Sequence, residues 1–263
     1  MQKNIIEVND LKKSFKNKKE INDVLKGVNF SVREGQIFAL LGSNGAGKTT
    51  TIRILTTLIN PSSGSASICD YDVIKNANSV RENISLTGQY AAVDEVLTGR
   101  ENLIIIASLL GIKNPRIVAT ELIQKFSMED FADRRVNTYS GGMRRRLDIS
   151  MSLLGDRPVI FLDEPTTGLD PQVRKQMWEV IKELANSGKT VFLTTQYLEE
   201  AEQLADYIAI LHEGKIALEG TLGELKKAMP NWKPVLIETS PSLEDIFMAL
   251  VENKLTDENG GNE

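Results

Sequence analysis

The sequence predicts an α/β protein with a largely parallel sheet, and three observations carry this prediction. Short apolar runs typical of strands alternate with amphipathic helical segments along most of the 263 residues. A glycine-rich turn joins the strand-like run 36–41 to a helical segment. Two acidic residues end a second apolar run, 158–162, at the place where doubly wound sheets bind ligands. The length allows one domain, or one domain with a small appendage.

The composition narrows the class of protein. With 41% hydrophobic and 25% charged residues and a net charge of −5, the chain is typical of globular proteins and gives no sign of general nucleic-acid binding. Its one cysteine, Cys69, and its one histidine, His212, exclude an internal disulfide and a Cys/His zinc cluster. We expect Cys69 in a strand and His212 near a turn. The chain has neither a run of the ~20 apolar residues that a membrane helix needs nor a signal-peptide core, so a soluble, cytoplasmic chain is expected.

Alternating apolar residues predict strands at 5–11 and 25–32, joined by a polar, lysine-rich connection. Phe15 lies in this connection. Its ring fits two interpretations, stacking on an adenine base or anchoring the loop, and the local sequence does not choose between them.

The segment after the next strand matches the phosphate-binding pattern of Gly, four residues, Gly, Lys and then Ser or Thr. Such a turn aims backbone N–H groups and the positive end of a helix dipole at one point, which suits a polyphosphate. We expect Lys48 to reach the β- and γ-phosphates and the Thr49 hydroxyl to bind Mg²⁺. The predicted phosphate loop consists of Gly42, Ser43, Asn44, Gly45, Ala46, Gly47, Lys48, Thr49 and Thr50. The chain is therefore predicted to bind a nucleoside triphosphate.

The region after the loop changes from mixed to helical. The loop helix is expected to carry Ile52, Leu55 and Leu58 on one side, and a dense turn signal covers 60–65. A short polar helix at 76–81 and a strand at 84–87 follow, and Gln89 comes just after that strand. Residues 102–128 then keep a helical period with a break at 113–115. We expect a helical subdomain over 96–140 that interrupts the α/β pattern.

Ser140, Gly141 and Gly142 stand at the predicted start of a helix. A serine there is usually a cap, whereas the two glycines favour close approach of the backbone to a ligand. The buried stripe of this helix is predicted to be Leu147, Met151 and Leu154. The three arginines at 144–146 fit either binding to an acidic partner loop or a solvated helix face.

Asp163 and Glu164 end a strand whose apolar run predicts burial on both faces. Two adjacent carboxylates at such a place cost free energy unless a metal or a reaction needs them. In a chain with a phosphate loop, Asp163 is the expected Mg²⁺ ligand. Glu164 is the expected general base for a water that attacks the γ-phosphate.

The rest of the chain alternates again. Strands are expected at 190–195, 207–211 and 215–219, and helices at 172–186, 197–206 and 222–229. Gln196 directly follows the first of these strands. A strand at 235–238 and a helix at 243–251 belong to a small C-terminal extension, 223–253, and we expect a disordered tail at 254–263.

Together these motifs resemble the nucleotide-binding subunit of an ATP-binding cassette (ABC) transporter over nearly the whole chain. The phosphate loop, the signature stretch Ser140-Gly141-Gly142-Met143 and the Asp163-Glu164 strand carry the resemblance. It implies a P-loop NTPase fold with an ABC-type core over 1–222, in which antiparallel N-terminal strands join a mixed, largely parallel sheet and an α-helical signature subdomain is inserted. It also implies a head-to-tail dimer, in which the signature of one protomer closes over the γ-phosphate of Mg-ATP held by the other.

The resemblance implies roles for further residues. Phe15 resembles the adenine-stacking aromatic, and Asp170 resembles the aspartate that crosses the dimer interface. Gln89 resembles the glutamine that contacts Mg²⁺ and couples to the membrane subunit, and Glu164 matches the catalytic glutamate. Gln196 stands where most members place a histidine against the γ-phosphate. Since an amide can donate a hydrogen bond but cannot titrate, we expect slower hydrolysis than with histidine.

Three stretches, 85–90, 139–148 and 195–200, are similar to the daunorubicin-resistance type of drug-export ATPase. That branch implies a separate, usually six-helix membrane permease subunit and a peripheral location on the cytoplasmic face of a prokaryotic membrane. The predicted function is ATP hydrolysis by a pair of ATP-binding subunits, expected to be a homodimer, that powers export of a drug-like or lipophilic compound. No nucleic-acid partner is expected.

Other functions stay open at this point. A non-transport ATPase of the same fold is one, although the chain lacks the coiled-coil insertion of repair members and the second cassette usual in translation members. A small-molecule kinase is another, against which the signature and the acidic pair argue. Within transport, lipid, polysaccharide or ions are alternative cargoes, because the cassette is not expected to touch the cargo.

Overall fold

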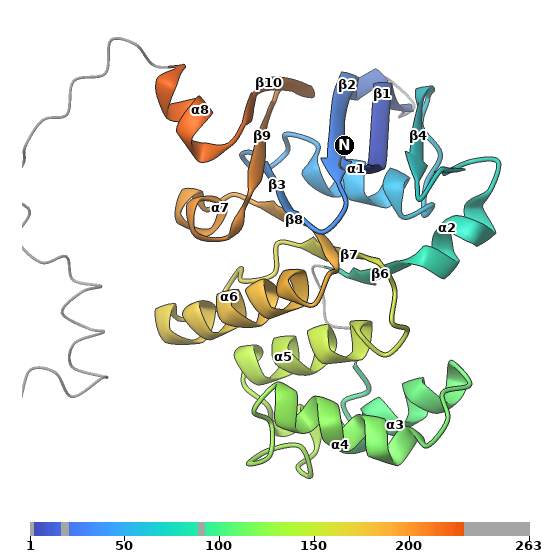
Figure 1. The fold of residues 1–263 in the computed structure, drawn as a ribbon, viewed down its shortest axis with the longest axis vertical. Helices are drawn as coiled ribbons and strands as arrows, with labels where there is room; N and C mark the ends of the chain where they lie inside the picture. Colours follow the sequence, from blue (N-terminus) through green and yellow to red (C-terminus); the bar gives the residue numbers. More distant parts are fainter. Residues whose placement is uncertain (1–2, 17–20, 89–92, 229–263) are drawn as a thin grey trace, which may run out of the picture.

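The computed structural model describes residues 3–16, 21–88 and 93–228, and these residues form two sheets with helices around them (Figure 1). The larger sheet has six strands in the order β10-β9-β3-β8-β7-β6. Its strands are β3 (Ile37–Leu41), β6 (Ile84–Thr87), β7 (Val159–Asp163), β8 (Thr190–Thr195), β9 (Tyr207–His212) and β10 (Lys215–Gly220). All neighbouring strands are parallel except β9 and β10, which pair antiparallel.

The smaller sheet is antiparallel and has the order β2-β1-β4-β5. Its strands are β1 (Asn4–Lys16), β2 (Ile21–Arg33), β4 (Ser63–Ile68) and β5 (Tyr71–Asp72). The predicted combination of antiparallel N-terminal strands with a largely parallel sheet is therefore confirmed.

The helices cover both faces of the larger sheet. They are α1 (Lys48–Leu55), α2 (Ala77–Asn83), α3 (Gly99–Leu109), α4 (Pro115–Lys125), α5 (Gly141–Ser152), α6 (Pro171–Asn186), α7 (Leu198–Leu204) and α8 (Leu222–Lys227), with a 3-10 turn at Val136–Thr138. Helix α1 lies with the antiparallel sheet on one side, α5 and α6 lie on the other, and α3 and α4 lie beyond α5 (Figure 1). Within the described residues, no helix is both long and apolar enough to cross a bilayer.

Two hydrophobic cores result from the period of two in the central strands. In β3, Ile37, Ala39 and Leu41 face a core shared with α5 and α6, whereas Phe38 and Leu40 face a core shared with α1 and the antiparallel sheet. Every residue of β3, β7 and β8 is buried, as their apolar runs predict. The sheet edge that carries the acidic pair is therefore held firmly from both sides.

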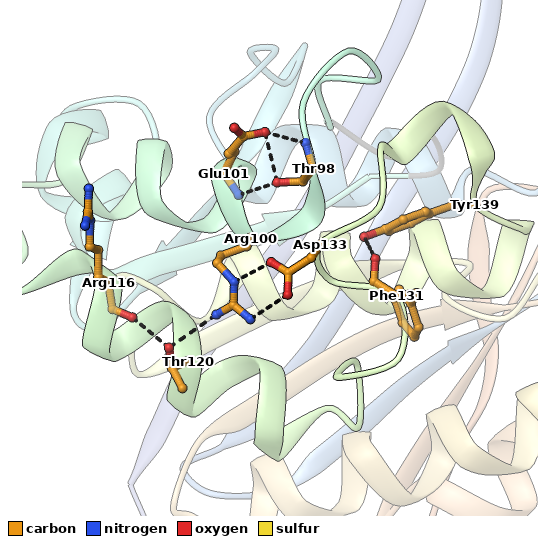
Figure 2. Close-up of polar contacts among 8 residues, drawn as sticks. All are labelled: Thr98, Arg100, Glu101, Arg116, Thr120, Phe131, Asp133 and Tyr139. Carbon is orange, nitrogen blue, oxygen red and sulfur yellow. Dashed lines mark hydrogen bonds and ion pairs between the residues drawn. The ribbon is translucent and has the colours of Figure 1, made fainter.

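Interlocking polar contacts fix the helical region between β6 and α5 (Figure 2). Thr98 and Glu101 form a capping box at the start of α3. Arg100 binds Asp133 through two hydrogen bonds and also donates to Thr120 of α4, while the Tyr139 hydroxyl donates to the carbonyl of Phe131 at 2.7 Å. Buried residues of α3 and α4 belong to the same core as one face of the larger sheet. The predicted subdomain boundaries, 96 and 140, stay a prediction.

Three local predictions are wrong. Leu58 is 58% exposed, because Thr57 has a positive φ of 63° and α1 already ends at Leu55. The expected turn at 60–65 is shorter, because β4 begins at Ser63 and pairs with Lys12 of β1. Cys69 lies in the turn between β4 and β5, with a φ of 51°, and not in a strand.

Other predicted features agree with the structure fully or in part, or lie outside the described residues. Leu154 is buried as expected but follows the end of α5. His212 ends β9 beside a turn, as predicted. The predicted C-terminal extension begins inside α8. The elements expected at 235–238 and 243–251, and the tail at 254–263, lie outside the described residues.

Candidate nucleotide-binding and catalytic site

The phosphate loop joins the end of β3 to the start of α1, and two of its glycines are required by close packing. A Cβ atom on Gly42 would lie 2.5 Å from the carbonyl oxygen of Leu211. Gly47 has a φ of 113°, and a Cβ atom there would lie 2.7 Å from the Leu25 side chain. The loop is thus held between β2 and β9 while its other side faces a pocket.

This pocket has a volume of about 400 Å³. Its lining residues are Asn22, Val24, Asn44, Gly45, Gly47, Lys48, Thr49, Thr50 and Glu164. Six loop residues and the predicted general base therefore share one cavity, although Glu164 is far from the loop in the sequence.

Lys48 lies at the centre of the site. Its Nζ donates to the carbonyl oxygens of Gly42 at 2.8 Å and Ser43 at 3.1 Å, and lies 3.2 Å from Oε1 of Glu164. The side chains of Lys48 and Glu164 are only 4% and 8% exposed. The ammonium group is therefore positioned beside both the loop and the carboxylate.

Asp163 brings a carboxylate to the hydroxyl of Thr49. Thr49 Oγ1 donates to Asp163 Oδ1 at 3.3 Å, and Thr194 Oγ1 donates to the same oxygen at 2.6 Å. A hydroxyl next to one carboxylate is a fitting partial ligand set for Mg²⁺, which keeps several waters and is completed by substrate phosphates. The donor set therefore fits the metal role predicted for Thr49 and Asp163.

Glu164 has an unusual backbone conformation. Its φ is 49°, a value that non-glycine residues rarely adopt and that surrounding contacts must enforce. Its N–H donates to the carbonyl oxygen and to the hydroxyl of Thr194, both at 3.1 Å, and Thr167 Oγ1 donates to its carboxylate at 3.3 Å. The turn after β7 is thus held in the conformation that directs Glu164 toward Lys48.

The signature stretch and Asp170 are not among the residues that line this pocket. Ser140 caps α5 by accepting from the Met143 N–H at 3.3 Å, and Asp170 caps α6 by accepting from the Val173 N–H at 3.0 Å. A Cβ atom on Gly141 would meet no neighbour within 4 Å, whereas one on Gly142 would lie 2.6 Å from Val173. Packing against α6 therefore explains Gly142, and Gly141 leaves its backbone open.

Three further predicted site residues are Phe15, Gln196 and Gln89. Phe15 lies in β1, which extends to Lys16, and not in the predicted connection between strands. It is 40% exposed, has Lys13 Nζ 5.0 Å from its ring centre, and pairs across the sheet with Asn22 of the pocket. Gln196 is partly buried directly after β8. Gln89 lies outside the described residues.

Sequence reasoning missed three parts of the site. Asn22 and Val24 carry no local signal that would place them at the pocket. Thr194 could have been noticed as one of two hydroxyl residues, Thr194 and Thr195, that end an apolar strand before Gln196. The third is Arg145: of the two interpretations of 144–146, neither describes this residue, which is buried against the turn after β7.

Comparison with known proteins agrees with this geometry. The family model described as ABC transporter matches residues 25–167, more than half of the 263-residue chain. The chain therefore belongs to the ABC transporter family.

Two curated relatives and one solved structure indicate its place in the family. It is 51% identical over 205 residues to the daunorubicin/doxorubicin resistance ATP-binding protein DrrA of Streptomyces peucetius, covering 77% of this chain and 62% of that protein. It is 41% identical to the Nod factor export ATP-binding protein I of Burkholderia orbicola, covering 75% of this chain and 66% of that protein. The chain thus spans less than two thirds of either relative. A dimeric ATP-binding cassette in a post-hydrolysis state, bound to ADP and Pi, superposes with a TM-score of 0.74 at 26% identity, covering 82% of this chain and 98% of that one.

Proposed function

We propose that this chain is the ATP-hydrolysing subunit of an ABC exporter and that it drives efflux of a drug-like or lipophilic compound. One observation supports the hydrolytic part most directly: Lys48, Asp163 and Glu164 converge beside the phosphate loop. The 51% identity to an ATP-binding protein of daunorubicin/doxorubicin resistance supports the cargo class.

Each side chain of the site has its own role in the proposed hydrolysis. Backbone N–H groups of the loop and the Lys48 ammonium bind the phosphates. Thr49 and Asp163 would hold Mg²⁺, with Gln89 as a further ligand, and the ion would neutralise phosphate charge. Glu164 accepts a proton from the attacking water, and Gln196 donates a hydrogen bond to the γ-phosphate. Phe15 stacks on the adenine.

A second ATP-binding subunit completes each site in this proposal. Ser140, Gly141 and Asp170 are exposed and lie away from the pocket of their own chain, which fits a role at the site of a partner. The similarity to a dimeric cassette supports the same arrangement. A homodimer is the simplest form.

The partner in the membrane is proposed to be a separate permease that docks on the helical region. Large apolar side chains are exposed there, including Val96, Leu109 and Ile117 at 73%, 77% and 58%. Such a gathering of exposed apolar residues is typical of an interaction surface. This docking would hold the chain at the cytoplasmic face of the membrane. The relative named for Nod factor export keeps another cargo class as the alternative.

The Glu164→Gln variant tests the proposal. Without the general base, we expect ATP turnover to fall by about 10²–10⁴-fold while ATP still binds. The matched control is Glu183→Gln on the exposed side of α6, which should keep normal turnover. The tagged Glu164→Gln protein is then recovered from solubilised membranes in ATP. A polytopic membrane protein that co-purifies supports the exporter, whereas recovery of ribosomes or of soluble proteins alone contradicts it.

A further inference from the structure

The three consecutive arginines on α5 contact three different parts of the fold. Arg144 pairs with Glu95 at 2.6 Å and donates to the carbonyl oxygen of Asn137 at 3.4 Å. Arg146 donates to the carbonyl oxygen of Ser127 at 2.9 Å and to Gln176 of α6 at 2.6 Å. These two side chains attach α5 to its neighbours in the helical region and to α6.

Arg145 instead reaches the turn after β7. Its Nη2 donates to the carbonyl oxygen of Asp163 at 3.1 Å, and its Nε donates to the carbonyl oxygen of Pro165 at 2.8 Å. Its Nη1 donates to the carbonyl oxygen of Gly88 at 2.5 Å. One guanidinium group therefore holds the backbone on both sides of Glu164 and the residue that directly follows β6.

The site of Arg145 requires a guanidinium group. The residue is only 7% exposed, and its Nη1 lies 3.4 Å from Asp148 Oδ2. Burial lowers the pKa of this group, while the charges of Asp148, Asp163 and Glu200 act in the opposite direction, and arginine stays charged in proteins. The N–H donors of the guanidinium group lie in one rigid plane, an arrangement that the lysine ammonium group cannot reproduce.

We propose that Arg145 is a positioning residue for ATP hydrolysis, which fixes the backbone around Glu164 so that the carboxylate faces the phosphate loop. The inference rests on the proposed role of Glu164 as general base. It follows from two observations together: Glu164 has a φ of 49°, and the carbonyl groups that Arg145 holds are those of the residues on either side of it. A strained residue keeps its conformation only when its surroundings determine it.

The test compares Arg145→Met and Arg145→Lys with Arg146→Met in the full chain. Turnover at saturating Mg-ATP, the KM for ATP and the thermal unfolding midpoint are measured for each variant. For Arg145→Met we expect kcat to fall by about 10- to 100-fold, because a displaced catalytic group costs rate even when binding is kept. The KM should change by less than about threefold, since the loop that binds the phosphates is untouched. Arg145→Lys should lie between Arg145→Met and the wild type.

Arg146→Met is the matched control, since it also removes arginine hydrogen bonds from α5 but none to the turn. It should lower the unfolding midpoint and leave kcat within about twofold of the wild type. Equal losses of kcat in the Arg145 and Arg146 variants would overturn the inference. If Arg145→Met does not fold, normal kcat in Arg145→Lys overturns it instead. Glu164→Gln is assayed in parallel. Normal turnover of Glu164→Gln would contradict the proposed function. If Glu164→Gln loses turnover while both Arg145 variants keep a normal kcat, only the inference about Arg145 is wrong.

Discussion

The hydroxyl of Thr194 contacts both acidic residues of the site. It donates to the Asp163 carboxylate at 2.6 Å and accepts from the N–H of Glu164 at 3.1 Å. Because β8 lies next to β7 in the sheet, this residue comes to the acidic pair from a strand that is distant in the sequence. It is placed to set the orientation of the predicted metal ligand.

The Thr194→Val variant removes this hydroxyl with almost no change of shape. We expect turnover to fall by about tenfold and the Mg²⁺ requirement to rise, because the Asp163 carboxylate loses its shortest hydrogen bond. Stability should fall by about 1–3 kcal/mol. Turnover as a function of Mg²⁺ concentration and urea unfolding measure the two effects.

Thr190→Val is the control for this change. Thr190 lies in the same strand, is equally buried, and accepts a hydrogen bond from the N–H of Gly35 at 2.9 Å. The control should lose similar stability and keep its turnover. Similar turnover in both variants would show that Thr194 contributes only to packing.

At the scale of elements, Glu200 joins three parts of the fold. It lies on α7 with no exposed surface and accepts hydrogen bonds from Thr166 after β7, at 2.7 Å, and from Trp178 of α6, at 3.2 Å. Burial raises the pKa of this carboxyl, although these hydrogen bonds and the charge of Arg174 lower it. The folded state therefore retains this proton to higher pH than the unfolded chain does.

This shift gives a pH dependence with a definite sign. Above the unfolded pKa of about 4.5, the unfolded chain binds fewer protons at this position, so the contribution of Glu200 to stability decreases as pH rises. Glu200→Gln, which stays neutral, should therefore gain stability relative to the wild type as pH increases. Urea unfolding between about pH 4 and pH 8 measures this difference. Glu183→Gln serves as the exposed control, and a pH-independent loss of stability in Glu200→Gln would contradict the prediction.

The elements that sequence patterns predicted best are those in which one face or both faces are buried. The apolar runs of β3, β7 and β8 predicted buried strands, and parallel strands bring their ends together, so the phosphate loop and Asp163-Glu164 were expected at one edge. The early end of α1 depends on the positive φ of Thr57, which residue periodicity does not reveal. Thr194 and Arg145 were missed because their role depends on which strands are neighbours and on how α5 packs.

At the scale of the whole molecule, the nucleotide pocket and the proposed docking surface are separate. The nucleotide pocket is lined by β2, the phosphate loop, the start of α1 and Glu164. A separate group of exposed apolar side chains lies on or beside α3 and α4: Val96, Ile105, Leu109, Leu110 and Ile117. These two surfaces lie on different parts of the fold (Figure 1). We therefore expect that binding of the membrane partner can be removed without loss of ATP hydrolysis by the chain alone.

Leu109→Asp tests this separation, since Leu109 is 77% exposed at the end of α3. The charge should lower recovery of the membrane partner with the tagged chain by about tenfold, as expected for one central apolar contact. Basal turnover should stay within about twofold of the wild type. Leu198→Asp is the control, because Leu198 is 70% exposed on α7, away from this region. If the control reduces recovery as strongly as Leu109→Asp does, the partner does not select the helical region, and the proposed docking surface is wrong.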